Sequence, residues 1–209
     1  MNNLLKKAIL IILICSFNTS AFSLSSEWSQ AEVSKVRLIS PFTNNNNQDE
    51  FILGLQYKMD PGWKTYWKSP GDGGFAQDLL WEKSTNINNI EIEWPKPKSF
   101  EILDLDTIGY EDEVIFPLVV NIKDKSKITN IDMSINYLVC KDICIPGNAR
   151  IFLDIPDGKA KTTEHYHLIE KTKSSLPQTS LVLSFINNFD SKAYKKNNNI
   201  LLEVKAETS

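Results

Sequence analysis

Hydrophobic positions alternate with polar ones along most of the chain between residues 31 and 155. The two clearest runs place Phe51, Leu53, Leu55 and Tyr57 on one face of a strand, and Ile131, Met133, Ile135, Tyr137 and Val139 on one face of another. A period of two with many β-branched and aromatic residues is typical of half-buried antiparallel strands. The same signal predicts further strands at residues 33–39, 63–68, 79–82, 90–94, 114–122 and 150–155.

Turn-rich pieces such as SPFTNNNN, SPGDGG and WPKPKS separate these expected strands. Many short strands with this punctuation are typical of an all-β, immunoglobulin-like β-sandwich. We assign the sandwich to residues 24–157 and expect its core to contain four large aromatic side chains, because aromatic residues dominate small β cores. These are Trp63, Trp67, Trp81 and Trp94.

The pattern changes after residue 157. Residues 158–176 are predicted to be a helical connector, with a helix at about 163–175 that is capped by Thr162 or Thr163 and ends before Pro177. Two short apolar runs, 180–186 and 200–206, then flank a polar, Asn-rich stretch. Two strands are too few to make a core alone. Residues 177–209 are therefore expected to be a partial second β segment or a truncated domain.

Residues 1–23 have the form of a secretory signal peptide, with two lysines, an apolar run at 8–17 and small residues before the expected cleavage site. The apolar run is too short for a membrane span, and we expect none in the mature chain. The predicted location is the periplasm. Removal of the signal takes away Cys15, Lys6 and Lys7, which changes the formal net charge from −3 to −5. An acidic chain of this kind gives no reason to expect nucleic acid as a partner.

Cys140 and Cys144 are then the only cysteines of the mature chain, within the stretch YLVCKDICIPG. Cysteines four positions apart on an extended strand lie roughly 13 Å apart, whereas a disulfide needs Cα atoms within about 7 Å. A disulfide would therefore require a turn through residues 141–143, with Pro146-Gly147 as its exit. Closing so short a loop stabilises the fold by only about 2 kcal/mol. A redox role consequently gains over a structural one.

Other chemistries fit the sequence less well. Two thiolates cannot complete a tetrahedral zinc site, and His165 and His167 are expected to be solvated on different sides of the helix. No metal or other cofactor is therefore predicted, although copper(I), which accepts two soft ligands, stays open as an alternative. No Ser-His-Asp set or carboxylate pair supports hydrolysis. Lys141 would favour a neighbouring thiolate and Asp142 would oppose one, so the sequence does not give the direction in which the thiol pKa values are shifted.

Four phrases occur in a fixed order: GWKTYWKSPGDGG at 62–74, EWPKP at 93–97, GYEDEVIFP at 109–117 and YLVCKDICIPG at 137–147. Together they resemble the N-terminal periplasmic domain of DsbD-type thiol:disulfide interchange proteins, especially the variety related to copper-sensitivity suppressors. The resemblance spans most of residues 31–155. It implies an immunoglobulin-like domain that passes electrons between other proteins, in processes such as cytochrome c biogenesis and copper tolerance.

The resemblance also implies roles for individual residues. Cys140 and Cys144 match the redox pair of the family, with attack on the partner by the second cysteine. Tyr66 falls where some members carry a tyrosine beside the pair. An aromatic-bearing loop covers the cysteines in the family, and residues 100–107 correspond to it, so Phe100 and Leu103 are possible supporting residues. The implied partners are a membrane electron donor and periplasmic disulfide or thioredoxin-like proteins.

Two features differ from the family. The best-known members have more residues between the cysteines, and complete members continue into membrane helices and a thioredoxin-like domain. Our leading hypothesis is a periplasmic protein-disulfide reductase module that cycles Cys140 and Cys144 between dithiol and disulfide. The alternatives are a non-enzymatic immunoglobulin-like binding module with a static disulfide, and a copper(I)-handling domain that uses the same two sulfurs.

Overall fold

The structure is a computed structural model that describes residues 22–177, 186–196 and 199–208. The predicted signal peptide therefore lies almost entirely outside the described residues. The chain divides into two compact units, Met1–Leu176 and Pro177–Ser209. No helix among the described residues is long and apolar enough to cross a membrane.

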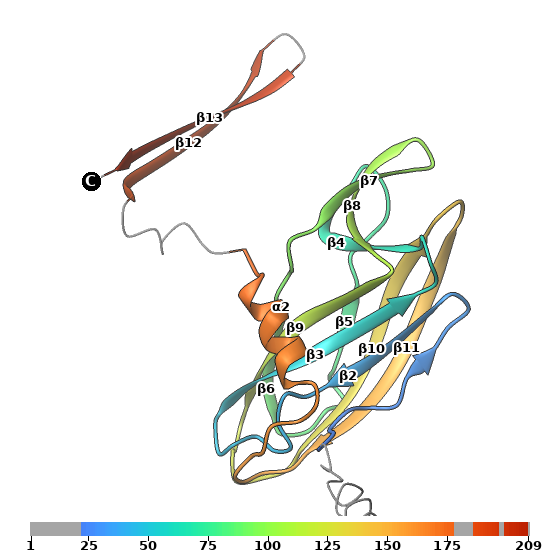
Figure 1. Cartoon of the computed structure of the whole chain (residues 1–209), viewed down its shortest axis with the longest axis vertical. Helices are drawn as coiled ribbons and strands as arrows, with labels where there is room; N and C mark the ends of the chain where they lie inside the picture. The colour runs from blue at the N-terminus through green and yellow to red at the C-terminus, as the bar shows by residue number, and fades with distance from the viewer. Residues whose placement is uncertain (1–21, 178–185, 197–198, 209) are drawn as a thin grey trace, which may run out of the picture. The chain divides into compact units, whose positions relative to one another are not determined.

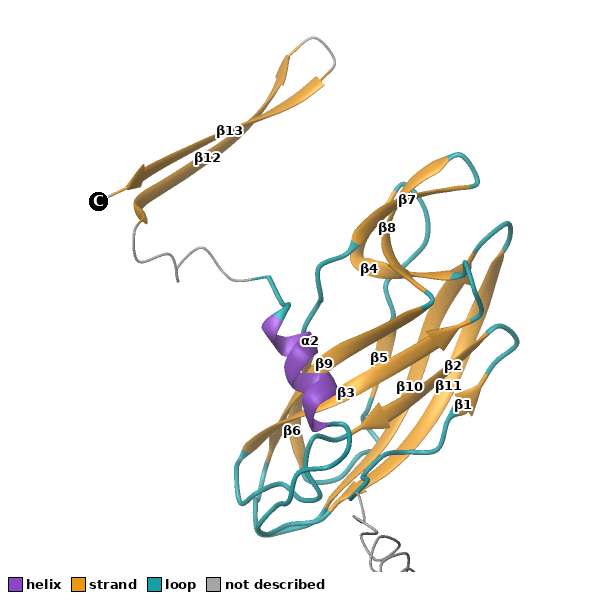
Figure 2. Ribbon diagram, in the orientation of Figure 1, coloured by secondary structure: helices purple, strands orange, loops and turns teal. Residues whose placement is uncertain are grey.

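The described part of the first unit contains two antiparallel sheets and one helix (Figures 1 and 2). The first sheet has the strand order β1 (Ser29–Gln30), β2 (Ser34–Ile39), β3 (Glu50–Met59), β9 (Glu113–Ile122) and β6 (Ile87–Ile92). The second has the order β11 (Cys144–Ile155), β10 (Thr129–Cys140), β4 (Lys64–Gly71), β8 (Leu105–Glu111) and β7 (Lys98–Ile102), with β5 (Asp78–Leu80) also paired to β10. The prediction of an all-β sandwich is confirmed.

The core lies between the two sheets, where the alternating apolar positions face one another. Tyr57 of the first sheet packs edge-on against Phe116 and against Tyr137 of the second, with ring centroids 5.5 and 5.2 Å apart. Edge-to-face contacts of this kind stabilise aromatic pairs beyond their area burial. The four tryptophans are partly buried and pack against this core. The alternation read from the sequence therefore assigns the inner faces of the long strands correctly.

The helix α2 (Tyr166–Ser174) covers the outer face of the first sheet (Figures 1 and 2). Its fully buried Ile169 packs on Ile39 and Ile115, and the absence of a side chain at Gly54 leaves room for this contact. The helix begins later than predicted, and Thr163 does not act as its N-cap. Instead the Thr163 hydroxyl donates to the backbone carbonyl of Ser40 and accepts a hydrogen bond from the His165 amide.

His165 is also less exposed than expected, at 7% of its accessible surface. The sequence assigned it to a solvated helix, but it immediately precedes the helix and is enclosed where the chain docks on the sheet. Burial lowers the pKa of His165, and the nearby positive charge of Arg37 lowers it further, against the opposing effect of Glu164. The imidazole is therefore kept neutral by its surroundings.

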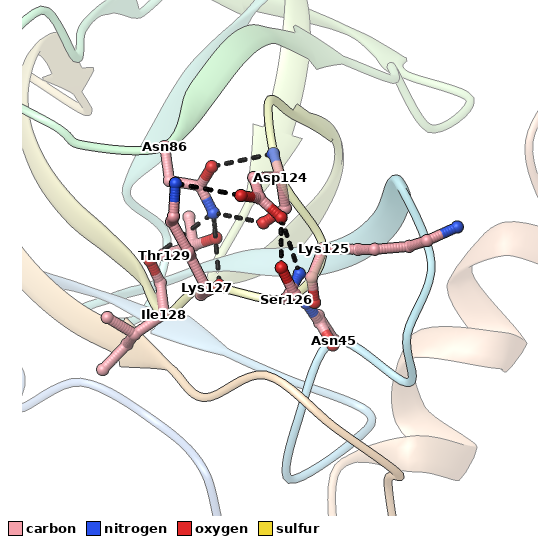
Figure 3. Close-up of polar contacts among 8 residues, drawn as sticks. All are labelled: Asn45, Asn86, Asp124, Lys125, Ser126, Lys127, Ile128 and Thr129. Atoms are coloured by element: carbon pink, nitrogen blue, oxygen red, sulfur yellow. Dashed lines mark hydrogen bonds and ion pairs between the residues drawn. The ribbon is translucent and has the colours of Figure 1, made fainter.

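Asn86 ties together two loops at the end of the sandwich where β10 begins (Figure 3). Its side-chain amide donates to the carbonyls of Asp124 and Lys127 and to the Thr129 hydroxyl, and its side-chain oxygen accepts from the Asp124 amide. Asn86 adopts a left-handed backbone with φ 64°, which asparagine tolerates better than most residues. Hydrogen bonds from Ser126 and then Lys127 lower the pKa of Asp124 to about 2.

Two expectations for local structure are wrong. Residues 100–107, expected as a covering loop, belong mainly to the β7–β8 hairpin, whose two-residue turn is Leu103-Asp104. Pro146-Gly147, expected as the exit of a turn, lies inside β11, which begins at Cys144. β11 is an edge strand, where a proline without an N–H is tolerated because one side of the strand needs no partner. Gly147 fits because Tyr137 occupies the space a side chain would need.

The second unit is described as a hairpin of β12 (Ile186–Lys196) and β13 (Asn199–Thr208). The expected strand at 200–206 is present within β13, whereas most of the strand expected at 180–186 lies outside the described residues. The polar stretch that was expected to separate two strands forms β12 instead. Strand pairing uses backbone groups, so a polar sequence can pair when a partner strand lies opposite.

Candidate redox site

The β10–β11 hairpin brings the two cysteines together. Cys140 ends β10 and Cys144 begins β11, and the two residues lie directly opposite in the strand register. The chain reverses through residues 141–143, where the Lys141 amide donates to the Ile143 carbonyl. The sulfur atoms are joined in a disulfide, and the Cα atoms are 4.1 Å apart. The chain therefore leaves the strand after Cys140, as a disulfide between these two residues requires.

The two cysteines differ sharply in exposure. Cys140 has no accessible surface, whereas Cys144 is exposed. Ile143, between them, is 60% exposed. Tyr137 and Val139 face the core, so the alternation of the strand places Cys140, and with it the directly paired Cys144, on the outer face of the second sheet. A separate small cluster then covers Cys140 there.

Tyr66 contacts the buried sulfur of the disulfide directly. Its hydroxyl donates a hydrogen bond of 2.9 Å to the Cys140 sulfur, and its side chain is 2% exposed. The contact follows from the pairing of β4 with β10, in which Lys64 lies opposite Cys140, so Tyr66 two positions on shares its face. Burial raises the pKa of Tyr66, so the phenol keeps its proton and acts as a donor well above neutral pH.

Gly74, in the connection from β4 to β5, lies against the ring of Tyr66. A side-chain carbon built at Gly74 would overlap the Tyr66 ring, and the glycine has φ 88°. Only glycine allows the backbone this close approach together with a left-handed conformation. The SPGDGG segment, which the sequence identified only as a turn, therefore also encloses the tyrosine that contacts the buried sulfur.

The β7–β8 hairpin supplies the remaining cover. Ile102 is buried with Tyr66 and Cys140, and Phe100 packs against this cluster. Leu103 does not belong to it: the residue occupies the tip of the hairpin and is 57% exposed. Of the three supporting residues that the resemblance suggested, the structure brings Tyr66 and Phe100 to the cysteines and leaves Leu103 outside.

Two lysines beside the pair are held by other groups. Lys64 donates to the Gly62 carbonyl and pairs with Glu111 at 3.1 Å, while its amine lies 5.3 Å from the centre of the Phe100 ring. Lys141 donates to the Pro61 carbonyl at 3.3 Å. Sequence reasoning missed Lys64 because its position opposite Cys140 depends on the register between strands far apart in the chain. The residues described contain no group of three His, Cys, Asp or Glu side chains that could hold a metal ion.

Comparisons with known proteins agree with this architecture. The N-terminal periplasmic domain of ScsB from Proteus mirabilis has a similar structure, with a TM-score of 0.67 and 23% identity, over 90% of this chain and 71% of that one. The reduced N-terminal domain of DsbD from Neisseria meningitidis matches with a TM-score of only 0.31 and 11% identity, over 69% and 91% of the two chains. The first similarity confirms the immunoglobulin-like fold. The comparison with curated protein sequences gave no match.

The family assignment comes from the sequence itself. Residues 30–156 match the family described as "Thiol:disulfide interchange protein DsbD, N-terminal". This region contains both sheets except for the first residue of β1, together with the disulfide and the cluster that covers it. The chain therefore belongs to the family of DsbD N-terminal domains.

Proposed function

We propose that this chain is a periplasmic thiol:disulfide interchange module, a protein-disulfide reductase that cycles Cys140 and Cys144. Electrons would come from a membrane donor and pass to periplasmic disulfide or thioredoxin-like proteins. Family membership supports thiol:disulfide interchange in general, and the signal-like residues 1–23 support export. The observation that carries the proposal is the asymmetry of the pair: Cys144 is exposed, while Cys140 is buried and hydrogen-bonded to Tyr66.

Electron transfer to a partner begins at the exposed sulfur. The Cys144 thiolate attacks one sulfur of the partner's disulfide, forms a mixed disulfide and releases the other partner sulfur as a thiolate. The Cys140 thiolate then attacks Cys144, which restores the protein disulfide and releases the second partner sulfur. Two electrons and two protons leave the module, and the partner's disulfide becomes a dithiol.

Reduction of the module follows the same path in reverse. The donor's thiolate attacks the exposed Cys144 sulfur, because the Cys140 sulfur is inaccessible, and Cys140 leaves as a thiolate. The Tyr66 hydroxyl already points at the Cys140 sulfur and stabilises the negative charge that forms there. Hydrogen bonds to a charged acceptor are stronger than those to a neutral one. The burial of Cys140 therefore does not block the step, because this sulfur needs only to leave and return.

Single-cysteine variants test the proposal. Cys140→Ser should accumulate a covalent complex with an oxidised thioredoxin-like protein, because the resolving thiol is missing, and added dithiothreitol should release it. Cys144→Ser is the matched variant and should accumulate little complex, since its remaining thiol is buried. Non-reducing gel electrophoresis measures both. Trapping by Cys144→Ser alone would reverse the roles of the two cysteines, and trapping by neither variant would favour a static disulfide.

A further inference from the structure

Exposed hydrophobic side chains occur on three segments at the end of the sandwich that carries the disulfide turn (Figure 1). Ile143 lies between the two cysteines and is 60% exposed, and Leu103 at the tip of the β7–β8 hairpin is 57% exposed. Leu105 of β8 and Phe75, which precedes β5, are 41% and 45% exposed. Single exposed apolar residues are ordinary, but a group on neighbouring segments marks an interaction site.

Contacts join two of these three segments. The Asp72 amide donates to the Asp106 carbonyl at 2.9 Å, and a side-chain carbon built at Gly73 would be 2.8 Å from Leu105. The segment before Phe75 therefore packs against the β7–β8 hairpin. The β7–β8 hairpin and the β10–β11 turn lie at the same end of the sandwich (Figure 1).

The backbone conformation of Leu103 indicates that this leucine does not stabilise the fold. Leu103 and Asp104 form the whole turn of the hairpin, with φ values of 54° and 62°. Two-residue turns with two left-handed residues strongly favour Asn-Gly or Asp-Gly, and leucine is disfavoured there. An apolar residue that is strained and exposed contributes little to folding, and strain of this kind is found at functional positions.

Acidic side chains surround the apolar group. Five exposed carboxylates lie on the three segments that carry it: Asp72, Glu101, Asp104, Asp106 and Asp142. None of them belongs to an ion pair with another described residue. Lys64 is paired with Glu111, whereas Lys141, which donates to the Pro61 carbonyl, and the exposed Lys98 of β7 keep their positive charges. The five carboxylates outnumber these two lysines. The surface beside the exposed sulfur is therefore apolar with an acidic edge.

We propose that Phe75, Leu103, Leu105 and Ile143, with the five carboxylates around them, form a docking surface for proteins whose reactive disulfide lies in an apolar patch edged by lysine or arginine. The inference rests on the proposed function and adds the chemistry of the partner. Burial of the apolar side chains between the two proteins holds the partner's disulfide beside the Cys144 sulfur, while opposite charges increase the rate at which the proteins associate. The partner's disulfide accepts the two electrons and two protons released when the Cys140–Cys144 disulfide forms.

Two synthetic peptide disulfides test this inference. Both are symmetrical dimers of a peptide with one cysteine flanked by leucines; one carries lysines at its ends, and the other carries glutamates. The reduced wild-type protein is mixed with each, and with the small neutral hydroxyethyl disulfide, and the rate of Cys140–Cys144 oxidation is measured. We expect the lysine peptide to react about tenfold faster than the glutamate peptide at low salt, and the difference to shrink at high salt.

Variants separate the apolar from the charged contribution. Leu103→Asn should lower the rate with the lysine peptide, relative to hydroxyethyl disulfide, at least about threefold, without lowering the melting temperature, because asparagine suits the turn. Phe152→Asn is the control, since Phe152 is 56% exposed but lies eight residues along β11 from Cys144. The double variant with Asp104→Asn and Asp106→Asn should reduce the difference in oxidation rate between the lysine and glutamate peptides. Asp157→Asn, beyond the far end of β11, should leave that difference unchanged.

Equal rates for the two peptides, with Leu103→Asn behaving like Phe152→Asn, would overturn the docking surface while leaving the proposed function intact. A reduced protein that fails to react even with hydroxyethyl disulfide would overturn both.

Discussion

The hydrogen bond from Tyr66 to the Cys140 sulfur should set part of the reduction potential. Tyr66→Phe removes only the hydroxyl and keeps the ring that packs with Ile102 and lies against Gly74. In the oxidised protein the hydroxyl donates to a disulfide sulfur, a weak acceptor. In the reduced protein it would donate to a thiolate when Cys140 is ionised. The variant therefore loses more stabilisation in the reduced state than in the oxidised state.

The size of the effect follows from the two kinds of hydrogen bond. A neutral hydrogen bond contributes about 0.5–1.5 kcal/mol, and one to a charged group contributes about 1.5–3 kcal/mol. The difference is about 1–1.5 kcal/mol, and about 1.4 kcal/mol corresponds to 30 mV for a two-electron couple. Tyr66→Phe should therefore make the reduction potential about 20–30 mV more negative under conditions where the thiolate is populated.

Redox titration in dithiothreitol buffers at pH 7 and pH 9 measures this shift. The shift should be larger at pH 9, because a cysteine thiol ordinarily ionises near pH 8.5, while burial raises the pKa of Tyr66 and keeps its hydroxyl a donor. Tyr110→Phe is the control, because it removes a buried hydroxyl that donates to the Pro95 carbonyl at 2.8 Å, away from the sulfurs. An unchanged or less negative potential in Tyr66→Phe, or an equal shift in Tyr110→Phe, would refute the reasoning.

Two further predictions concern the helix α2 and the residue before it. Ile169→Ala should lower the free energy of unfolding by about 2–5 kcal/mol, since Ile169 is fully buried against the first sheet. Leu168→Ala, at a residue 40% exposed, should have little effect. Urea titration compares the two variants, and similar losses of stability would contradict the docking of the helix on the sheet. Because burial, and then Arg37, lower the pKa of His165, the unfolded chain takes up a proton first, so stability should fall as pH decreases below about 6.5. His165→Gln should reduce this dependence and His167→Gln should not, as measured by melting temperature between pH 5 and 8; an unchanged slope in His165→Gln would contradict it.

The sequence predicts the long strands well because their inner faces alternate strictly. It fails at β7 and β8, where prolines precede the first strand and Leu103-Asp104 lacks the usual residues of a hairpin turn. It also misreads Pro146-Gly147 as a turn, because a proline is tolerated there only by virtue of the edge position of β11. At Pro146-Gly147 the deciding information is the position of the strand at the edge of the sheet.

The redox pair is visible in the sequence because only two cysteines are expected in the mature chain. The side chains around it are harder to predict. Tyr66 reaches Cys140 through the register between β4 and β10, which are 74 positions apart at this contact. The exposure of Leu103 and the burial of His165 depend on a two-residue turn and on helix docking. Local sequence identifies the reactive atoms, and nonlocal pairing determines their surroundings.

The midpoint potential of the Cys140–Cys144 pair tests the central claim most directly. Structural disulfides that resist reduction have potentials below about −300 mV, whereas disulfides that exchange with other proteins lie above this value. Equilibration of the purified protein with dithiothreitol and glutathione buffers, followed by thiol alkylation and mass spectrometry, measures it. We predict a value above about −300 mV. A lower value would mark the disulfide as a static structural bond and contradict the account.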